Sequence, residues 1–452
     1  MVALKALLDD VAQRAARYLE AAPERRVAPT QDALNAVESF DSGLAQRGRP
    51  ASDVLAQLDQ IGSPASTVMN GPRYFGFVIG GATPAALAAN WLSSAWDQNS
   101  GLHATTPVQA KLESIALNWM VELLGLPEGC GGSFVTGATV ANFVVLAAGR
   151  HRVLADAGWD VEADGLFGAP PITVLISEES HPSVYKSLGL LGLGRERVHR
   201  IPVDEQGRMR AEALPVPDGP TLVVTQVGNV NTGACDPVGE ICARLDGANA
   251  WVHVDGAFGL WASAAPTRRH LTAGMERADS WATDAHKWLN VPYDSGVGFV
   301  RDTAALKSAM AISAAYLPTE TDHRNPSDYT PELSRRARGV DIWAALSELG
   351  RRGVEDLVER CCAHARAFAH GLEGLGYTIL NDVVLNQVLV RFGDDGRTQA
   401  VIKAVQEDGT CWCGGTVWQG KAAMRISVSN WQTTGDDVAR SIAAIHRVAS
   451  SL

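Results

Sequence analysis

The middle of the chain alternates between short apolar segments and longer amphipathic ones, and this alternation constrains the fold more than any other feature. Strands are predicted at 133–136, 172–177, 222–226, 251–254, 280–283 and 297–301. Helices are predicted near them, at 108–124, 137–151, 183–191 and 238–245. Short apolar strands that alternate with helices are typical of a mostly parallel sheet covered by helices on both faces. The sequence therefore predicts an α/β fold.

Two flanking segments differ from this middle part. Residues 1–83 carry helical patterns at their start and at 50–61, show no strand pattern, and are expected to form an arm or cap. Residues 350–452 combine three helical segments with two strand-like ones and predict a smaller α+β domain. We thus expect three parts: an arm (1–83), a large domain (84–349) and a small C-terminal domain (350–452).

The composition is that of an ordinary globular protein, with 46% hydrophobic and 20% charged residues among 452. The net charge is −11, and no dense run of basic residues is present, so a nucleic-acid partner is not expected. No apolar stretch is long enough to cross a membrane. The seven scattered cysteines are typical of reduced side chains, and together these features predict a cytoplasmic protein with no metal site.

Lys287 lies in the segment 284–288, just after the predicted strand 280–283, and is flanked by Trp281 and Trp288. Open α/β sheets bind ligands beyond the carboxyl ends of their strands. A lysine among apolar residues loses hydration, and its amine becomes a nucleophile for carbonyl groups. The alternative, a solvated lysine with a buried stem, remains open on this stretch alone.

Asp255 ends another apolar strand and is followed by small residues. A buried carboxylate is costly unless it is paired, and the ring nitrogen of pyridoxal phosphate (PLP) is a suitable partner because the carboxylate keeps that nitrogen protonated. Asp255 and Lys287 are separated by 32 positions, one strand–helix–strand unit, so they can face one another. An aspartate that caps the following turn is the alternative.

Two further segments add to this pattern. The small-residue turn that contains Gly137, Ala138 and Thr139 opens a helix, where backbone N–H groups and hydroxyls bind phosphate well. His181 follows the strand 172–177, where an imidazole can stack on a flat cofactor. Taken alone, each segment has a simpler alternative. The turn can be an ordinary helix start, and His181 can be a structural histidine.

In their order along one sheet, these four elements resemble the group II PLP-dependent decarboxylases, which include aromatic-L-amino-acid, histidine and glutamate decarboxylases. The resemblance runs from about Pro72 to the C-terminus and is strongest at 130–145, 177–187 and 251–301. It implies the aspartate-aminotransferase architecture (PLP-dependent transferase fold type I), and a homodimer with active sites at the subunit interface.

The resemblance also implies roles for single residues. Lys287 would form a Schiff base with PLP, Asp255 would pair with the ring nitrogen, and His181 would stack on the ring. Ala257 would lie near the other face of the ring. Thr232, in a turn that resembles the family's Thr/Gly turn, would lie near the cofactor.

The phosphate and substrate positions follow in the same way. The phosphate would be surrounded by Gly137, Ala138, Thr139 and His286. Phe77 matches a substrate-pocket position and, with Phe75, permits an aromatic side chain. The implied reaction is decarboxylation of an L-amino acid to an amine and CO2, with the bond to the carboxylate held perpendicular to the ring. We expect an aromatic substrate first and an acidic one next.

The proton donor is less defined. Family members use a tyrosine on a mobile loop, and the corresponding segment here is 317–338, with Pro326 at the matching position. Tyr329 is the preferred candidate and His323 the second, while an ordinary loop tyrosine is the alternative for Tyr329.

Because the loop differs, other outcomes stay open on the same scaffold. These are an aldolase, an aminotransferase and a decarboxylation-dependent oxidative deaminase. Arg425 resembles the arginine that grips a substrate carboxylate in aminotransferases. A non-catalytic PLP-binding protein is the remaining hypothesis.

Overall fold

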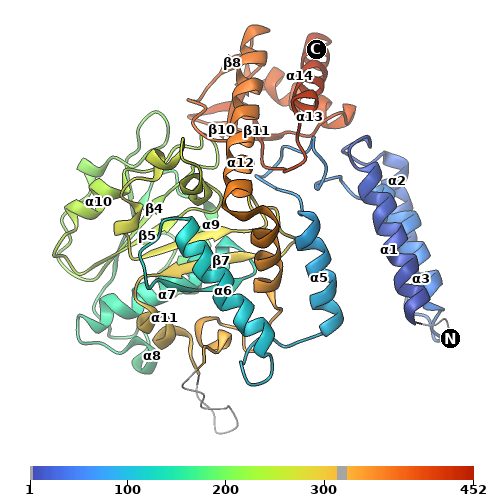
Figure 1. The fold of residues 1–452 in the computed structure, drawn as a ribbon. Coiled ribbons are helices and arrows are strands. Elements are labelled where there is room, and N and C mark those ends of the chain that lie inside the picture. The colour runs from blue at the N-terminus through green and yellow to red at the C-terminus, as the bar shows by residue number, and fades with distance from the viewer. Residues whose placement is uncertain (1–3, 313–322) are drawn as a thin grey trace. The chain divides into compact units, whose positions relative to one another are not determined.

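The computed structural model describes residues 4–312 and 323–452, which pack into two compact units (Figure 1). One unit comprises Gly80–Ala365 and Asn381–Gln387, and we call it the sheet unit. The other comprises Met1–Ile79, described from Leu4, together with Arg366–Leu380 and Val388–Leu452, and we call it the terminal unit. The expected division of the chain into an arm (1–83), a large domain (84–349) and a small domain (350–452) stays a prediction.

The sheet unit is built on seven strands in the order β1-β7-β6-β5-β4-β2-β3. Their bounds are β1 Gly131–Val135, β2 Thr173–Ser177, β3 Val198–Ile201, β4 Thr221–Gln226, β5 Ala250–Asp255, β6 Ser280–Asp284 and β7 Gly296–Val300. The pairs β3–β2, β2–β4, β4–β5 and β5–β6 are parallel, whereas β7 runs antiparallel to both β6 and β1. The expected mostly parallel sheet is therefore confirmed, with one reversed strand.

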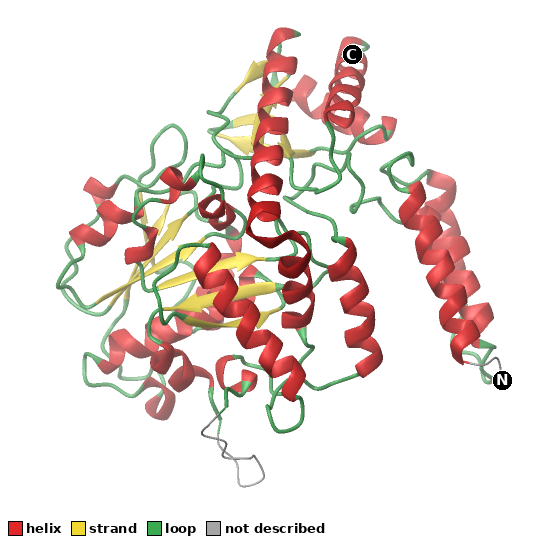
Figure 2. Ribbon diagram, viewed as in Figure 1, coloured by secondary structure: helices red, strands yellow, loops and turns green. Residues whose placement is uncertain are grey.

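Helices enclose this sheet (Figure 2). They are α5 Pro84–Trp96, α6 Pro107–Leu123, α7 Ala138–Ala155, α8 Val161–Asp164, α9 Pro182–Leu190, α10 Val238–Arg244 and α11 Thr303–Met310. Short helical turns are η3 Ala211–Ala213, η4 Gly259–Ala264, η5 Arg269–Thr272, η6 Met275–Arg277 and η7 Pro326–Tyr329. Helix α7 packs on β1, β4, β5, β6 and β7, so its apolar residues form the main core with the strands.

The long helix α12 (Arg338–Gly374) begins in the sheet unit and ends in the terminal unit. Its helical geometry is interrupted at Gly350, where φ is 59°. Glycine adopts this conformation without steric cost, so it is a favourable residue for the break. The helix predicted at 354–375 corresponds to the segment after this break.

The terminal unit joins the two ends of the chain. Its helices are α1 Leu4–Ala21, α2 Gln31–Ala36, η1 Val37–Phe40, α3 Ala51–Gln57, η2 Leu58–Gly62, α4 Ser63–Ala65, α13 Asp395–Asp408 and α14 Gly435–Ser450. A four-stranded sheet has the order β10-β11-β9-β8, with β8 Thr378–Ile379, β9 Gln387–Arg391, β10 Gly414–Trp418 and β11 Lys421–Ser427. Buried Arg73 donates to the backbone oxygens of Pro23, Arg25 and Thr410 and so ties the N-terminal segment to this sheet.

Among residues 4–312 and 323–452, no helix combines the length and the apolar character that crossing a bilayer requires.

A buried ion pair connects α6 with the segment before α12. Glu113 Oε2 lies 2.7 Å from Arg335 Nη1, and the two side chains are 1% and 0% exposed. Arg335 also donates to the backbone oxygens of Ser100 and Phe134. Removing one partner of such a pair leaves an uncompensated charge in the interior.

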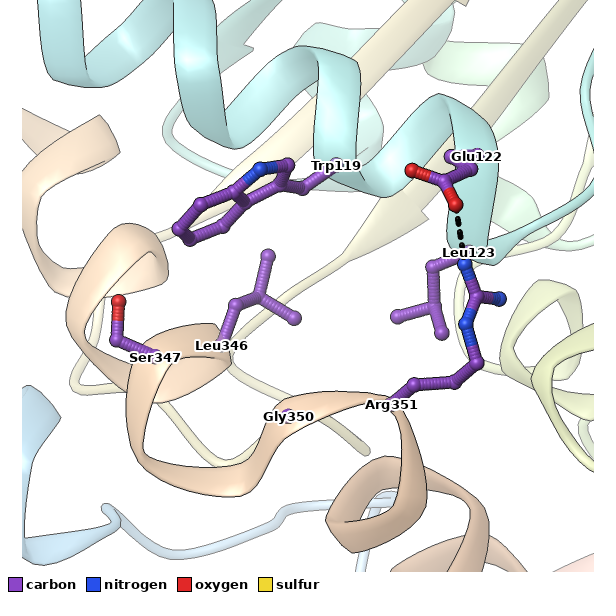
Figure 3. A pocket seen from close by; sticks show the side chains of 7 residues that line it. All are labelled: Trp119, Glu122, Leu123, Leu346, Ser347, Gly350 and Arg351. Carbon is purple, nitrogen blue, oxygen red and sulfur yellow. Dashed lines mark hydrogen bonds and ion pairs between the residues drawn. The ribbon is translucent and has the colours of Figure 1, made fainter.

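We therefore expect Glu113→Gln to lower the free energy of unfolding by about 3–5 kcal/mol. The matched control is Glu122→Gln on the same helix, because Glu122 pairs with Arg351 at 2.7 Å in an open groove where both side chains are more than half exposed (Figure 3). An exposed pair of this kind contributes about 0–1 kcal/mol. Denaturant titration of both variants measures the difference, and equal losses would contradict the assignment of the buried pair as a structural tie.

Candidate active site

The carboxyl ends of six strands meet at one edge of the seven-stranded sheet, and five of these strands lead into predicted site residues. Strands β2, β4, β5 and β6 are parallel to one another, and β1 runs in the same direction because β7 is antiparallel to both β1 and β6. The segments that follow these ends carry the residues predicted for the cofactor. The fold thus brings together side chains that are far apart in the sequence.

Lys287 lies in the turn after β6. Its Nζ is 3.0 Å from Asp284 Oδ2, and its side chain is about one-fifth exposed while that of Asp284 is nearly buried. The turn is closely packed, since a Cβ on Gly80 would lie 2.0 Å from the backbone oxygen of Lys287. The lysine is therefore held at the sheet edge by an acid of its own turn.

Asp284 also joins this turn to α7. Its Oδ1 accepts a hydrogen bond of 2.6 Å from the backbone N–H of Ala138, the first residue of α7. A carboxylate at a helix N-terminus is stabilised by the free N–H groups and the helix dipole. Asp284 therefore fixes the lysine turn against the small-residue turn that we predicted as the phosphate site.

His286 is neutral and has a defined tautomer. The backbone N–H of Ser295 donates to its Nδ1 at 3.0 Å, so Nε2 carries the hydrogen and lies 3.6 Å from Asp284 Oδ2. Burial lowers the pKa of His286, an effect that Asp284 opposes and Lys287 reinforces. Its ring stacks on that of Tyr293 with centroids 4.3 Å apart. The Nε2–H group is thus a neutral donor beside the turn that opens α7.

Asp255 ends β5 with its side chain buried. Burial raises the pKa of Asp255, and the nearby charges of His181 and Lys287 act in the opposite direction, as do hydrogen bonds from Asn142 and from the N–H of Ala257. Asn142 Nδ2 lies 3.3 Å from Oδ2, and the Ala257 nitrogen lies 3.2 Å from Oδ1. A buried acid whose charged form is favoured by Lys287 and His181 fits a binding site better than a turn cap.

His181 precedes α9 and serves as its N-cap. Its Nδ1 accepts from the backbone N–H of Ser183 at 3.2 Å and lies 2.7 Å from Ser183 Oγ. The half-buried ring is therefore fixed in orientation at the start of α9.

The small-residue turn has the shape that we expected. Gly137 is extended and precedes α7, and a Cβ there would lie 3.3 Å from His286 Cε1. A Cβ on Gly296 of β7 would lie 2.4 Å from the Cα of Gly137, so the turn passes close to the sheet. Ala138 is buried and Thr139 half-buried. The predicted phosphate contacts of Gly137, Ala138, Thr139 and His286 stay predictions.

Ala257 and Thr232 lie at the same edge. The backbone oxygen of Ala257 accepts from the N–H of Asp284 at 2.8 Å, which joins the ends of β5 and β6. Thr232 lies in the turn after β4, where its hydroxyl donates to the oxygen of Gln206 at 2.7 Å. This hydroxyl therefore stabilises its own loop, and a cofactor contact for Thr232 stays a prediction.

The predicted substrate residues belong to the terminal unit. Phe75 is fully buried and packs edge-on against Phe368, with centroids 4.9 Å apart. Phe77 is 60% exposed, has a φ of 52°, and stacks on Trp412 at 5.7 Å. A positive φ in a bulky residue is strained, and such strain often marks functional segments. Arg425, on β11, is half-buried, and burial lowers its pKa.

The proposed donor segment 317–338 begins outside the described residues, which resume at His323. The His323 ring stacks on that of His103 with centroids 3.9 Å apart. Tyr329 lies in η7, where the Arg324 guanidinium is 3.7 Å from its ring centre and where the ring packs on the main core. Tyr329 is therefore an anchored side chain, and its role in proton transfer stays a prediction.

Among the residues that contact the predicted site residues and that sequence reasoning missed are Asp284 and Asn142. Asp284 lies three positions before Lys287 at a strand end, which is a signal that could have been used. Asn142 lies in the middle of α7, and no local pattern marks it, because its contact with Asp255 arises only when α7 packs on β5.

The side chains present fit PLP. A buried carboxylate is available for a protonated ring nitrogen, a lysine amine for a carbonyl carbon, and the start of α7 for a phosphate. The buried hydroxyl of Ser295, next to the His286 turn, has no hydrogen-bond partner in the described chain and is a further donor at this place.

The sequence matches the family model described as the pyridoxal-dependent decarboxylase conserved domain over residues 34–392. Tryptophan decarboxylase 1 of Oryza sativa subsp. japonica is 27% identical over 350 residues, covering 72% of this chain and 67% of that protein. Acidic amino acid decarboxylase GADL1 of Bos taurus is 29% identical over 340 residues, covering 72% and 64%. The matched region thus spans about two thirds of the length of these two relatives.

The crystal structure of Oryza sativa TDC with PLP and tryptamine superposes with a TM-score of 0.91 at 22% sequence identity and covers 99% of this chain and 98% of that one. This likeness shows a shared fold. The family model covers most of the chain, and the chain therefore belongs to the pyridoxal-dependent decarboxylases, a family of PLP-dependent carboxy-lyases of fold type I.

Proposed function

We propose that this protein removes the carboxylate of an L-amino acid as CO2 and releases the amine, with PLP carried on Lys287. The observation that supports this most is the buried carboxylate of Asp255 within electrostatic range of Lys287 and His181 at the sheet edge. When bound, PLP supplies a ring that accepts the electron pair left by the departing CO2. The protein binds and orients the cofactor and the substrate.

Each residue of the site has a task in this proposal. Asp255 holds a proton at the ring nitrogen, and His181 presents a flat face to the ring. Asp284 holds the Lys287 ammonium at 3.0 Å, which keeps the amine at the turn when it is not bonded to the cofactor. The Nε2–H of neutral His286 donates to the phosphate.

An aromatic L-amino acid is the proposed substrate, with acidic amino acids as the second choice. The exposed ring of Phe77, stacked on Trp412, offers an aromatic surface. The relatives named above include a tryptophan decarboxylase and an acidic amino acid decarboxylase, so both classes are represented. Aldol cleavage, transamination and oxidative deamination are the alternative outcomes of the same binding step.

We also propose a homodimer with active sites at the interface. Helix α5 is rich in apolar residues yet buries only Ala86, and it exposes Trp91, Leu92 and Trp96 at 44%, 56% and 43%. Exposed aromatic and aliphatic side chains gathered on one helix are typical of a protein–protein interface.

A cytoplasmic location agrees with the cysteines. All seven are free and buried, as is common in a reducing compartment.

The reaction is tested with a panel of aromatic, acidic and basic L-amino acids, by measuring CO2 and amine. We expect CO2 and amine in equal amounts from an aromatic substrate, and no turnover above background in Lys287→Ala because the covalent link to PLP is lost. An unchanged melting temperature of Lys287→Ala, compared with wild type without added PLP, is the control for folding. Amine without CO2, a keto acid or an aldehyde in place of the amine, or full activity in Lys287→Ala would overturn the proposal.

Tyr329→Phe tests the proton donor. If Tyr329 returns the proton to the substrate carbon, we expect kcat to fall by about 10²–10⁴-fold while the melting temperature stays unchanged. If the residue only packs under Arg324, kcat remains near the wild-type value. His323→Asn is the parallel variant, and the larger loss of kcat between the two identifies the donor.

The double variant Leu92→Glu, Trp96→Glu tests the dimer. Charges on this face of α5 have to be desolvated in an interface, so we expect a shift from dimer to monomer in light scattering coupled to size exclusion. Phe167→Glu is the matched control, because Phe167 is 98% exposed in a loop outside α5. A wild-type protein that is monomeric at micromolar concentration would contradict the proposal.

A further inference from the structure

A series of buried hydrogen bonds runs through the sheet unit to Asp255. Trp251 Nε1 donates to Ser280 Oγ at 2.8 Å, and Ser280 Oγ lies 3.0 Å from His253 Nδ1. His253 Nε2 lies 3.0 Å from Asn142 Oδ1. Asn142 Nδ2 donates to Asp255 Oδ2 at 3.3 Å. We call this series the Asp255 chain, and its first three members have no part in the functions proposed above.

The charge of Asp255 sets the direction of every bond in the Asp255 chain. A carboxylate only accepts, so the amide nitrogen of Asn142 faces it and the amide oxygen faces His253. His253 must then carry its hydrogen on Nε2, which leaves Nδ1 as the acceptor for the hydroxyl of Ser280. The indole of Trp251 can only donate, and it satisfies the Ser280 oxygen.

The reverse direction is excluded while Asp255 is charged. A flipped Asn142 amide would place its oxygen against the carboxylate, and the other tautomer of His253 would place a lone pair against the Asn142 oxygen. Water cannot correct either mismatch, because Asn142, His253 and Ser280 are fully buried. Unpaired or opposed polar groups are costly in such surroundings.

His253 does not add a charge to the site. Burial lowers its pKa to about 3, so the imidazole is neutral at and around neutral pH. Its contribution is therefore the orientation of a dipole. The Nε2–H group fixes and polarises the Asn142 amide, and this strengthens the bond that the amide donates to the carboxylate.

We propose that His253 is a positioning residue for the cofactor, which acts through Asn142 to hold Asp255 in its charged form and in place for the ring nitrogen of PLP. This inference rests on the proposed pairing of Asp255 with that nitrogen. A hydrogen bond to a charged acceptor stabilises it more than one to a neutral acceptor. The Asp255 chain thus favours the ring in the protonated state.

The first experiment compares His253→Phe with His253→Gln in the full chain. Phenylalanine keeps the ring volume and loses both nitrogens, whereas glutamine keeps an N–H group for Asn142. We expect His253→Phe to raise the dissociation constant of PLP by about tenfold and to shift the visible absorbance of the bound cofactor. His253→Gln should stay within about threefold of wild type, since the donor to Asn142 remains.

Thr225→Val is the matched control. The Thr225 hydroxyl donates at 3.0 Å to the backbone oxygen of His253 and not to its ring, and it is buried on the neighbouring strand β4. Loss of the Thr225 hydroxyl removes a buried hydrogen bond and lowers the free energy of unfolding, as His253→Phe also does, but it leaves the Asp255 chain intact. A wild-type dissociation constant and spectrum in His253→Phe, or an equal effect in Thr225→Val, would overturn the role of His253.

A second experiment reads the tautomer directly and separates the two proposals. Nitrogen NMR of histidine-labelled protein, assigned with His253→Gln, should show hydrogen on Nε2 and none on Nδ1, and hydrogen on Nδ1 would refute the direction argued here. If Asp255→Asn leaves PLP affinity and the spectrum unchanged, the pairing of Asp255 with the ring fails. If Asp255→Asn alters both and His253→Phe alters neither, only the role of His253 fails.

Discussion

The carboxylate of Asp255 is placed where water does not reach it, and much of the site is arranged around the cost of that placement. Burial alone favours the neutral acid, which would leave a ring nitrogen without a partner. His181 and Lys287 oppose this from the side proposed for the cofactor, and Asn142 opposes it from the core. The buried carboxylate is therefore favoured in its charged form both by Lys287 and His181 and by the amide of Asn142.

Asp284 restricts the position of the Lys287 side chain. A lysine amine at a sheet edge has four flexible side-chain bonds, and ordering it costs conformational entropy. Asp284 accepts from Ala138 at the start of α7 and holds Lys287 at 3.0 Å, so one carboxylate fixes both the helix and the amine. This carboxylate lies at the predicted phosphate site, where a phosphate would share the N–H groups of α7 with it.

Much of this arrangement could be predicted from the sequence, because it depends on local pattern. The strands that end at Asp255 and before Lys287 are short, apolar and bounded by small residues, and the family resemblance agreed with their order. Other features depend on tertiary packing. Strand β3 shows only weak alternation of buried and exposed residues, and β8 has only two residues, so neither strand has a clear sequence pattern. The contact of Asn142 with Asp255 exists only because α7 crosses β5. No periodicity reveals such a contact.

Control of the cofactor and choice of the substrate are assigned to different parts of the chain. The residues proposed to set the charge at the ring nitrogen lie in the core of the sheet unit, where a substitution also affects folding. The residues proposed for the substrate, Phe75 and Phe77, lie in the terminal unit, and Phe77 adopts a strained, exposed conformation next to Trp412. In this proposal, selection can change the substrate through exposed positions such as Phe77 without disturbing the buried hydrogen bonds behind Asp255.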